Sequence, residues 1–165
     1  MQRERRLIAA ELAGNIGKLN ATSTSMAPNN CLQKECILAI DDEAGFLGLL
    51  KMQLESQGYA VHTASNPQEA IKVYQERGQE IGMVLLDYLL PQMSGDLVFD
   101  ELQRLNPEVR VVLLTGCEKS VAAKLFQRGL RGYLRKPFRL PALVQQVKNT
   151  ISSPPSSSAA SPSLS

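Results

Sequence analysis

Ile37-Leu38-Ala39-Ile40-Asp41-Asp42-Glu43 is the stretch that decides the fold, because an apolar run ends in it abruptly at a group of acids. Three later segments repeat this design, and each ends an apolar run near a polar side chain. They are Met83-Val84-Leu85-Leu86-Asp87, Val111-Val112-Leu113-Leu114-Thr115-Gly116 and Gly132-Tyr133-Leu134-Arg135-Lys136-Pro137. A strand that helices cover on both faces is apolar throughout, so each run predicts a buried parallel strand.

Helical patterns separate these runs. In the first of them, Phe46, Leu49, Leu50 and Leu54 recur at helical spacing, and Gly58 ends the pattern. We expect strands at 37–40, 59–63, 83–86, 109–114 and 133–135, and helices at 44–56, 67–77, 96–105, 119–128 and 141–151. This alternation predicts an α/β fold with a doubly wound five-stranded parallel sheet, strand order 2-1-3-4-5, and helices on both faces.

Ligands of such sheets bind at the carboxyl ends of the strands, where the strand order reverses. We therefore expect Asp41, Asp42 and Asp87 to meet at this switch point, with Thr115 and Lys136 on the same rim. Three adjacent carboxylates repel one another, and a hard cation such as Mg²⁺ removes that conflict. The set is suited to binding a divalent cation and accepting a phosphoryl group on a carboxylate.

The middle zone of the chain resembles the receiver domain of two-component response regulators. The resemblance rests on Ile40-Asp41-Asp42-Glu43, on Leu86-Asp87 with Pro91 and Gly95 in the next loop, on Leu114-Thr115-Gly116, and on Lys136-Pro137-Phe138. It implies a flavodoxin-like fold and a phosphorylation-controlled binding switch, rather than an enzyme that releases a chemical product.

The resemblance also implies a role for each acid. Asp87 would be the phospho-acceptor. Asp42 would bind Mg²⁺ directly, Asp41 would act through a bound water, and the backbone carbonyl of Leu89 would be a further ligand.

The remaining roles belong to residues of the last two motifs. Thr115 and Lys136 would bind phosphoryl oxygens, Tyr133 would be the aromatic switch residue, and Pro137 would follow a cis peptide bond. Leu89 and Cys117 occupy positions that influence phosphate hydrolysis in the family. Neither side chain orients an attacking water well, so we expect slow loss of phosphate.

The implied partners are a sensor histidine kinase or a histidine phosphotransfer protein as donor. A downstream protein would bind the face formed by 119–128, 133–135 and 141–151. A phosphorylation-dependent homodimer through that face is an open alternative. We expect no direct contact with nucleic acid, since 18 Lys and Arg against 16 Asp and Glu give a net charge of only +2.

The 165 residues divide into three zones. Residues 1–35 form an N-terminal extension, part helical or disordered, 36–152 the receiver domain, and 153–165 a disordered tail rich in Ser, Pro and Ala. The tail is too short to fold into an output module. Three cysteines without a secretory leader, and no run near the roughly 20 apolar residues of a membrane span, favour a cytoplasmic protein.

Three alternatives accompany these expectations. The chain could be a receiver-shaped scaffold that is never phosphorylated. A haloacid-dehalogenase-like phosphatase would share an Asp, a Thr and a Lys, but it expects an Asp where this chain has Glu43. Finally, Asp41 or Asp42 could cap the first helix, because Asp is a good N-cap residue.

Overall fold

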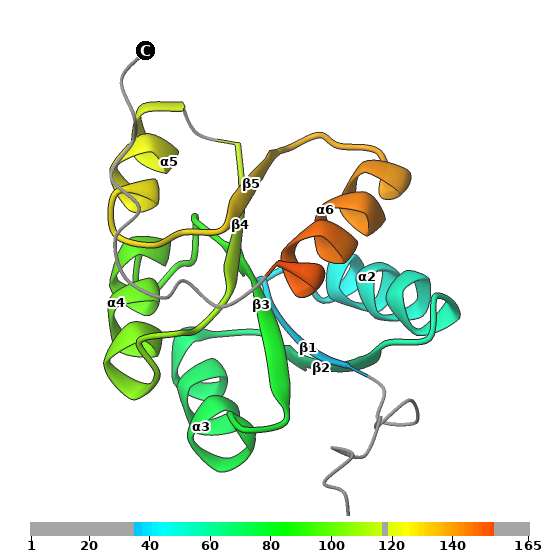
Figure 1. Cartoon of the computed structure of the whole chain (residues 1–165), viewed down its shortest axis with the longest axis horizontal. Coiled ribbons are helices and arrows are strands. Elements are labelled where there is room, and N and C mark those ends of the chain that lie inside the picture. The colour runs from blue at the N-terminus through cyan, green and yellow to red at the C-terminus, as the bar shows by residue number, and fades with distance from the viewer. Residues whose placement is uncertain (1–34, 117–118, 154–165) are drawn as a thin grey trace, which may run out of the picture. The chain divides into compact units, whose positions relative to one another are not determined.

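The computed structural model describes residues 35–116 and 119–153, where strands and helices alternate along the chain (Figure 1). The strands are β1 (Cys36–Ile40), β2 (Ala60–Ala64), β3 (Ile81–Asp87), β4 (Val111–Thr115) and β5 (Gly132–Arg135). The helices are α2 (Ala44–Ser56), α3 (Pro67–Arg77), α4 (Gly95–Leu105), α5 (Lys119–Phe126) and α6 (Leu140–Ser152). The predicted N-terminal extension and tail lie outside the described residues, apart from Glu35 and Ser153.

All neighbouring strands run parallel, in the order β2-β1-β3-β4-β5. This confirms the predicted flavodoxin-like fold and its switch point, because β1 lies between β2 and β3 at the centre of the reversal. Helices α2 and α6 cover one face of the sheet, whereas α3, α4 and α5 cover the other (Figure 1). None of the described helices has the length and apolar character needed to cross a membrane.

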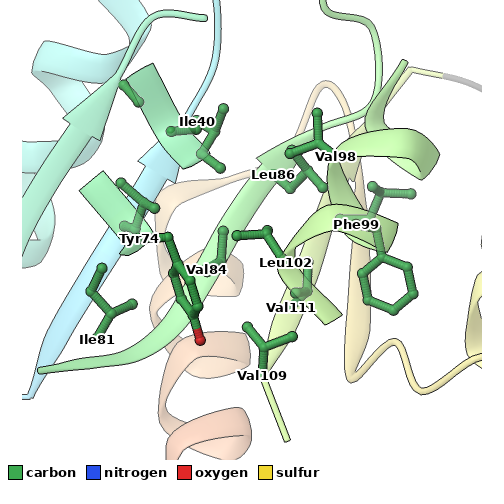
Figure 2. Packing of buried hydrophobic residues seen from close by; sticks show 14 of the residues in the cluster. Ile40, Tyr74, Ile81, Val84, Leu86, Val98, Phe99, Leu102, Val109 and Val111 are labelled. Carbon is green, nitrogen blue, oxygen red and sulfur yellow. The ribbon is translucent and has the colours of Figure 1, made fainter. Parts of the chain in front are cut away.

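Two apolar cores lie between the sheet and its helices. The core under α3, α4 and α5 includes Tyr74, Val84, Phe99 and Leu102, and it contains every side chain labelled in Figure 2. The core under α2 and α6 combines residues of these helices with the alternate residues of the same central strands. This alternation explains why the strands are apolar throughout: successive side chains enter opposite cores.

The buried side of α2 agrees with the predicted stripe at Leu50 and Leu54 but not at Leu49. The helix buries Leu47, Leu50 and Leu54, while Leu49 remains 45% exposed. Apolar residues occupy so many positions of this helix that two overlapping stripes have helical spacing. Packing against the sheet selects the stripe centred on Leu50.

Several predicted boundaries differ from the structure by one or two residues, as at β3, which begins at Ile81 rather than Met83, and two of the differences have a clear local reason. Val109 is buried but precedes β4, because its backbone N–H donates to the Asn106 carbonyl (3.0 Å) in a turn. Helix α5 ends at Phe126 rather than Arg128. There the backbone N–H of Arg128 donates to the Leu125 carbonyl (3.0 Å), a tighter turn than an α-helix makes.

Candidate functional site

The predicted acids meet at the carboxyl ends of the two central strands. Asp41 directly follows β1 and Asp87 is the last residue of β3, and these strands pair with Ile40 opposite Leu86. One carboxylate oxygen from each of Asp41, Asp42 and Asp87 lies within 4.8 Å of the others. Asp41 and Asp87 are buried, with exposed fractions of 1% and 6%, whereas Asp42 is exposed.

Lys136 supplies the positive charge of this cluster. Its ammonium Nζ lies 2.7 Å from Asp41 Oδ2 and 3.0 Å from Asp87 Oδ2, so one side chain bridges both buried acids. The backbone N–H of Lys136 donates to the Thr115 carbonyl (2.8 Å), which fixes the loop after β5 to the end of β4. The Lys136–Pro137 peptide bond is cis, as predicted.

Burial and ion pairing act against each other in this cluster. Burial raises the pKa of Asp87, and the hydrogen bond and charge of Lys136 offset this effect only in part. For Lys136, burial lowers the pKa, but the hydrogen bonds and charges of Asp41 and Asp87 together outweigh it, and the pKa is raised. The two directions agree physically, since one ammonium is shared between two carboxylates and fully compensates neither.

The donor set fits a hard divalent cation. All three acids offer oxygen ligands, and with one ammonium they leave an excess of two negative charges that such a cation would cancel. Asp42 makes no hydrogen bond or ion pair within the described residues, so its carboxylate is available as a ligand. The residues therefore agree with the expected Mg²⁺ site.

Backbone contacts hold the two buried carboxylates in place. Asp41 Oδ1 accepts a hydrogen bond from the Glu43 backbone N–H (2.9 Å), and Asp87 Oδ1 accepts one from the Leu89 N–H (3.3 Å). Glu43 itself is the N-cap residue of α2, with no side-chain capping bond, so the prediction that Asp41 or Asp42 caps this helix is wrong. Asp41 is turned toward the cluster instead.

Gly95 allows the loop after β3 to close. A Cβ atom at this position would lie 2.7 Å from the Tyr88 Cα and 2.9 Å from the Asp87 carbonyl oxygen, so any side chain would collide with backbone. The Gly95 N–H donates to the Tyr88 carbonyl (2.8 Å). The small residue thus brings the start of α4 against the chain next to Asp87.

Thr115 and Tyr133 lie on the two neighbouring strands. Thr115 is fully buried and is one residue beyond Leu114, the residue that pairs with Asp87 across β3 and β4. Tyr133 is half-buried on β5, and its ring meets the ring of Phe126 edge to face, with the centroids 6.1 Å apart. Thr115 therefore lies at the predicted rim, and Tyr133 connects β5 to α5. Cys117 lies outside the described residues.

Phe46 is a contributor that the sequence analysis treated only as an apolar helix residue. Its ring lies under the Lys136 ammonium, with Nζ 4.7 Å from the ring centroid, and it packs edge to face on Phe138. A cation above an aromatic face is attracted to it. An aromatic residue close after an acid pair is the signal that could have suggested this role.

Comparisons with known proteins agree with this geometry. The family model described as the response regulator receiver domain matches residues 37–148. Sensor kinase CckA of Brucella abortus is 32% identical over 116 residues, which are 70% of this chain and 12% of that protein. Transcriptional regulatory protein SrrA of Staphylococcus aureus is 35% identical over 112 residues, which are 68% of this chain and 46% of that protein.

A solved structure gives the same result. A response regulator receiver domain protein from Clostridium thermocellum shares 32% identity with a TM-score of 0.68, covering 71% of this chain and 94% of that one. The chain thus spans less than half the length of the two curated relatives, but it matches nearly the whole of this receiver domain. It belongs to the response regulator receiver domain family, whose members are phospho-accepting signalling switches rather than true enzymes.

Proposed function

We propose that this chain is a response regulator receiver that accepts a phosphoryl group on Asp87. The donor is a histidine of a sensor kinase or of a histidine phosphotransfer protein. The observation that carries the proposal is the buried Asp87 carboxylate at the end of β3, beside two more acids and the Lys136 ammonium. An Asp87 oxygen bonds to phosphorus as the phosphorus–nitrogen bond to the donor breaks, and that bond's electron pair stays on the imidazole nitrogen.

Asp41, Asp42, Asp87 and the backbone carbonyl of Leu89 would hold Mg²⁺, with Asp42 as a direct ligand and Asp41 acting through water. When bound, Mg²⁺ supplies positive charge against the phosphoryl oxygens. Lys136 provides a second positive charge from the protein side. Its ammonium already lies 3.0 Å from Asp87 Oδ2, so a small shift brings it to a phosphoryl oxygen.

Thr115 and Tyr133 would transmit the phosphorylation of Asp87 to the surface of the domain. The Thr115 side chain moves inward, and its hydroxyl donates to a phosphoryl oxygen. Tyr133 then moves into the space that Thr115 leaves. Because Tyr133 contacts Phe126, its movement alters the surface of α5, β5 and α6. That surface binds a downstream protein in the cytoplasm.

The phosphorylated state should persist. Leu89, two residues after Asp87, is 59% exposed and has no group that can hydrogen-bond to an attacking water. Water positioning contributes to the hydrolysis rate, so we expect the phosphoryl group to be lost slowly.

The test is intact mass spectrometry after incubation with Mg²⁺ and acetyl phosphate. We expect the wild-type protein to gain one phosphoryl group only when Mg²⁺ is present, and Asp87→Ala to gain none. Glu76→Ala is the matched control, since Glu76 is exposed on α3, outside the acidic cluster. The decay of the added mass in the same tube measures the persistence.

Two outcomes would contradict the proposal. No Mg²⁺-dependent gain would favour a scaffold that is never phosphorylated, and a gain that survives in Asp87→Ala would place the acceptor elsewhere. Loss of the phosphoryl group as fast as in short-lived chemotaxis-type receivers would refute the predicted persistence of phosphorylation but not the assignment of Asp87 as acceptor. Membership of the receiver family decides against the haloacid-dehalogenase-like phosphatase.

A further inference from the structure

The charges of this chain are divided unevenly between its two parts. Residues 35–116 contain 13 acidic and 5 basic residues. Residues 119–153 contain no Asp or Glu but eight basic residues: Lys119, Lys124, Arg128, Arg131, Arg135, Lys136, Arg139 and Lys148. The segment that builds α5, β5 and α6 is therefore uniformly basic, although the whole chain is nearly neutral.

Three of these basic residues surround the edge strand β5. Tyr133 packs into the core under α3, α4 and α5, whereas Leu134 packs into the opposite core, so Arg135 shares the side of Tyr133. Arg131, half-buried, comes just before the strand. We call Arg135 and Arg139, together with the aromatic pair Phe126 and Tyr133, the basic edge.

Arg139 lies where the chain passes from β5 to α6, which packs on β5. Gly132 of β5 lies against the Gln146 side chain, so closely that an added Cβ would collide with the Gln146 amide. Arg139 is the N-cap residue of α6, with extended backbone, and it follows Arg135 by four residues in the connection between β5 and this helix. It is exposed at the start of the helix. In Figure 1, β5 runs between α5 and α6 at the edge of the sheet.

Two charges of this edge have no counter-charge among the described residues. In the same segment, Arg128 forms an ion pair with Asp100, and Lys136 forms ion pairs with Asp41 and Asp87. Arg135 and Arg139 are exposed and form none there. Phe126, whose ring contacts Tyr133, is 43% exposed. Arginines and aromatic side chains are enriched at the cores of protein interfaces.

We propose that the basic edge binds an acidic segment of a partner protein, whose carboxylates pair with Arg135 and Arg139 and whose apolar side chain covers Phe126. This inference rests on the proposed function, because it assigns a partner chemistry to the surface that phosphorylation alters. The Tyr133 ring meets the Phe126 ring edge to face, so a shift of the Tyr133 ring changes the shape of the apolar contact. Phosphorylation therefore tunes the affinity of the edge.

The same charges argue against the two other occupants. A symmetric homodimer through this face would place arginines of one copy against arginines of the other, without an acid in 119–153 to pair with them. Nucleic acid is repelled by the acidic part of the domain, which cancels the long-range field that steers phosphate backbones. An acidic protein segment is short enough to contact only the basic edge. It therefore avoids both the repulsion between arginines and the repulsion by the acidic part of the domain.

The test is fluorescence anisotropy of a labelled Glu/Leu peptide, a matched Lys/Leu peptide and a short DNA duplex, each with phosphorylated and unphosphorylated full-length chain. We expect the Glu/Leu peptide to bind most tightly and to bind differently in the two states. The double variant Arg135→Glu/Arg139→Glu should weaken its binding about tenfold or more, since reversing two charges replaces attraction by repulsion. Phe126→Ser should also weaken it.

The control double variant is Lys51→Glu/Lys72→Glu, which makes the same change in net charge on α2 and α3. Both lysines are exposed, and we expect an affinity within about twofold of the wild type. Equal losses in the two double variants would overturn the proposal, because they would reveal only a net-charge effect. Tighter binding of DNA, or equal binding of the Lys/Leu peptide, would also overturn it.

Sedimentation of the phosphorylated protein supplies the remaining outcome. We expect a monomer, and a dimer that Phe126→Ser dissolves would overturn the proposal in favour of self-association. The phosphoryl gain measured by mass separates this inference from the proposed function. A protein that accepts phosphate on Asp87 but shows no Arg135-dependent peptide binding refutes the acidic partner alone.

Discussion

At the carboxyl ends of the strands, the molecule buries two carboxylates and bridges them with one ammonium, whereas between α3 and α4 a buried tyrosine forms a neutral hydrogen bond with a half-buried asparagine. In the first group, Lys136 lies 2.7 Å from Asp41 and 3.0 Å from Asp87. In the second, Asn106 Nδ2 donates to the Tyr74 hydroxyl (3.1 Å), and Figure 2 shows that hydroxyl at the Val109 end of the core.

The comparison shows two roles of polar groups inside the domain: the Tyr74–Asn106 pair stabilises the fold, whereas the charged group is suited to function. The neutral pair satisfies both partners, and burial raises the pKa of Tyr74, so its hydroxyl stays neutral to still higher pH. The charged group has one ammonium for two carboxylates, which a cation would complete. Such a site is incompletely compensated by the protein itself, and removing a single charge should have a large effect.

The largest effect should come from Lys136→Met. Without the ammonium, Asp41 and Asp87 become buried carboxylates with no counter-charge. We expect a loss of about 3 kcal/mol in the metal-free protein, near the lower end of the range for breaking a buried pair, because the Lys136 side chain is 28% exposed. Urea unfolding with EDTA measures it, and saturating Mg²⁺ should restore part of the stability.

Lys148→Met is the control for that variant. Lys148 is exposed on α6 and forms no ion pair within the described residues, so its replacement should change stability by less than about 0.5 kcal/mol. If the two variants unfold at the same urea concentration, the charged group does not contribute to stability as described.

Tyr74→Phe should have a smaller effect of about 1 kcal/mol, the usual loss for one buried hydrogen bond. Asn106 keeps a second contact, since its Oδ1 accepts from the Glu108 N–H (3.0 Å). Phosphoryl acceptance with Mg²⁺ should equal that of the wild type. Tyr59→Phe, which removes a hydroxyl with no hydrogen bond within the described residues, should be neutral. Loss of phosphoryl acceptance in Tyr74→Phe would show that the two groups are coupled.

The smallest change in the free energy of unfolding is expected for Asp87→Asn without metal. It should be a gain in stability, whereas the other variants lose stability. Burial raises the pKa of Asp87 above its ordinary value of 3.8, so the folded protein holds this proton more tightly than the unfolded chain. Stability from this group is present at low pH and is lost as pH rises from that ordinary value through the raised pKa. The amide avoids this loss, and we expect a gain below about 1 kcal/mol at pH 7.

Unfolding at several pH values in EDTA measures this gain. The difference between Asp87→Asn and the wild type should grow as pH rises above 3.8 and then become constant. Mg²⁺ should stabilise the wild type more than the variant. A variant that is less stable than the wild type at neutral pH in EDTA would show that the Lys136 ion pair outweighs burial.

The sequence alone was sufficient for the fold, the strand order and the meeting of the acids. Parallel strands bury both faces and read as apolar runs, and Asp41, Asp42 and Asp87 follow two such runs directly. Their convergence depends on local adjacency plus one rule about sheet topology. The sequence predicted the ends of strands less well where a buried residue, such as Val109, belongs to a turn rather than to a strand.

Only the tertiary structure decided which charged side chains form ion pairs with one another and which surface of each helix is buried. Asp41 and Lys136 lie 95 residues apart in sequence, and no periodic pattern indicates that one ammonium bridges two acids. The placement of Phe46 under Lys136 and the exposure of Leu49 likewise depend on how α2 rotates against the sheet. Local patterns fix what an element is, whereas long-range packing fixes what each side chain contacts.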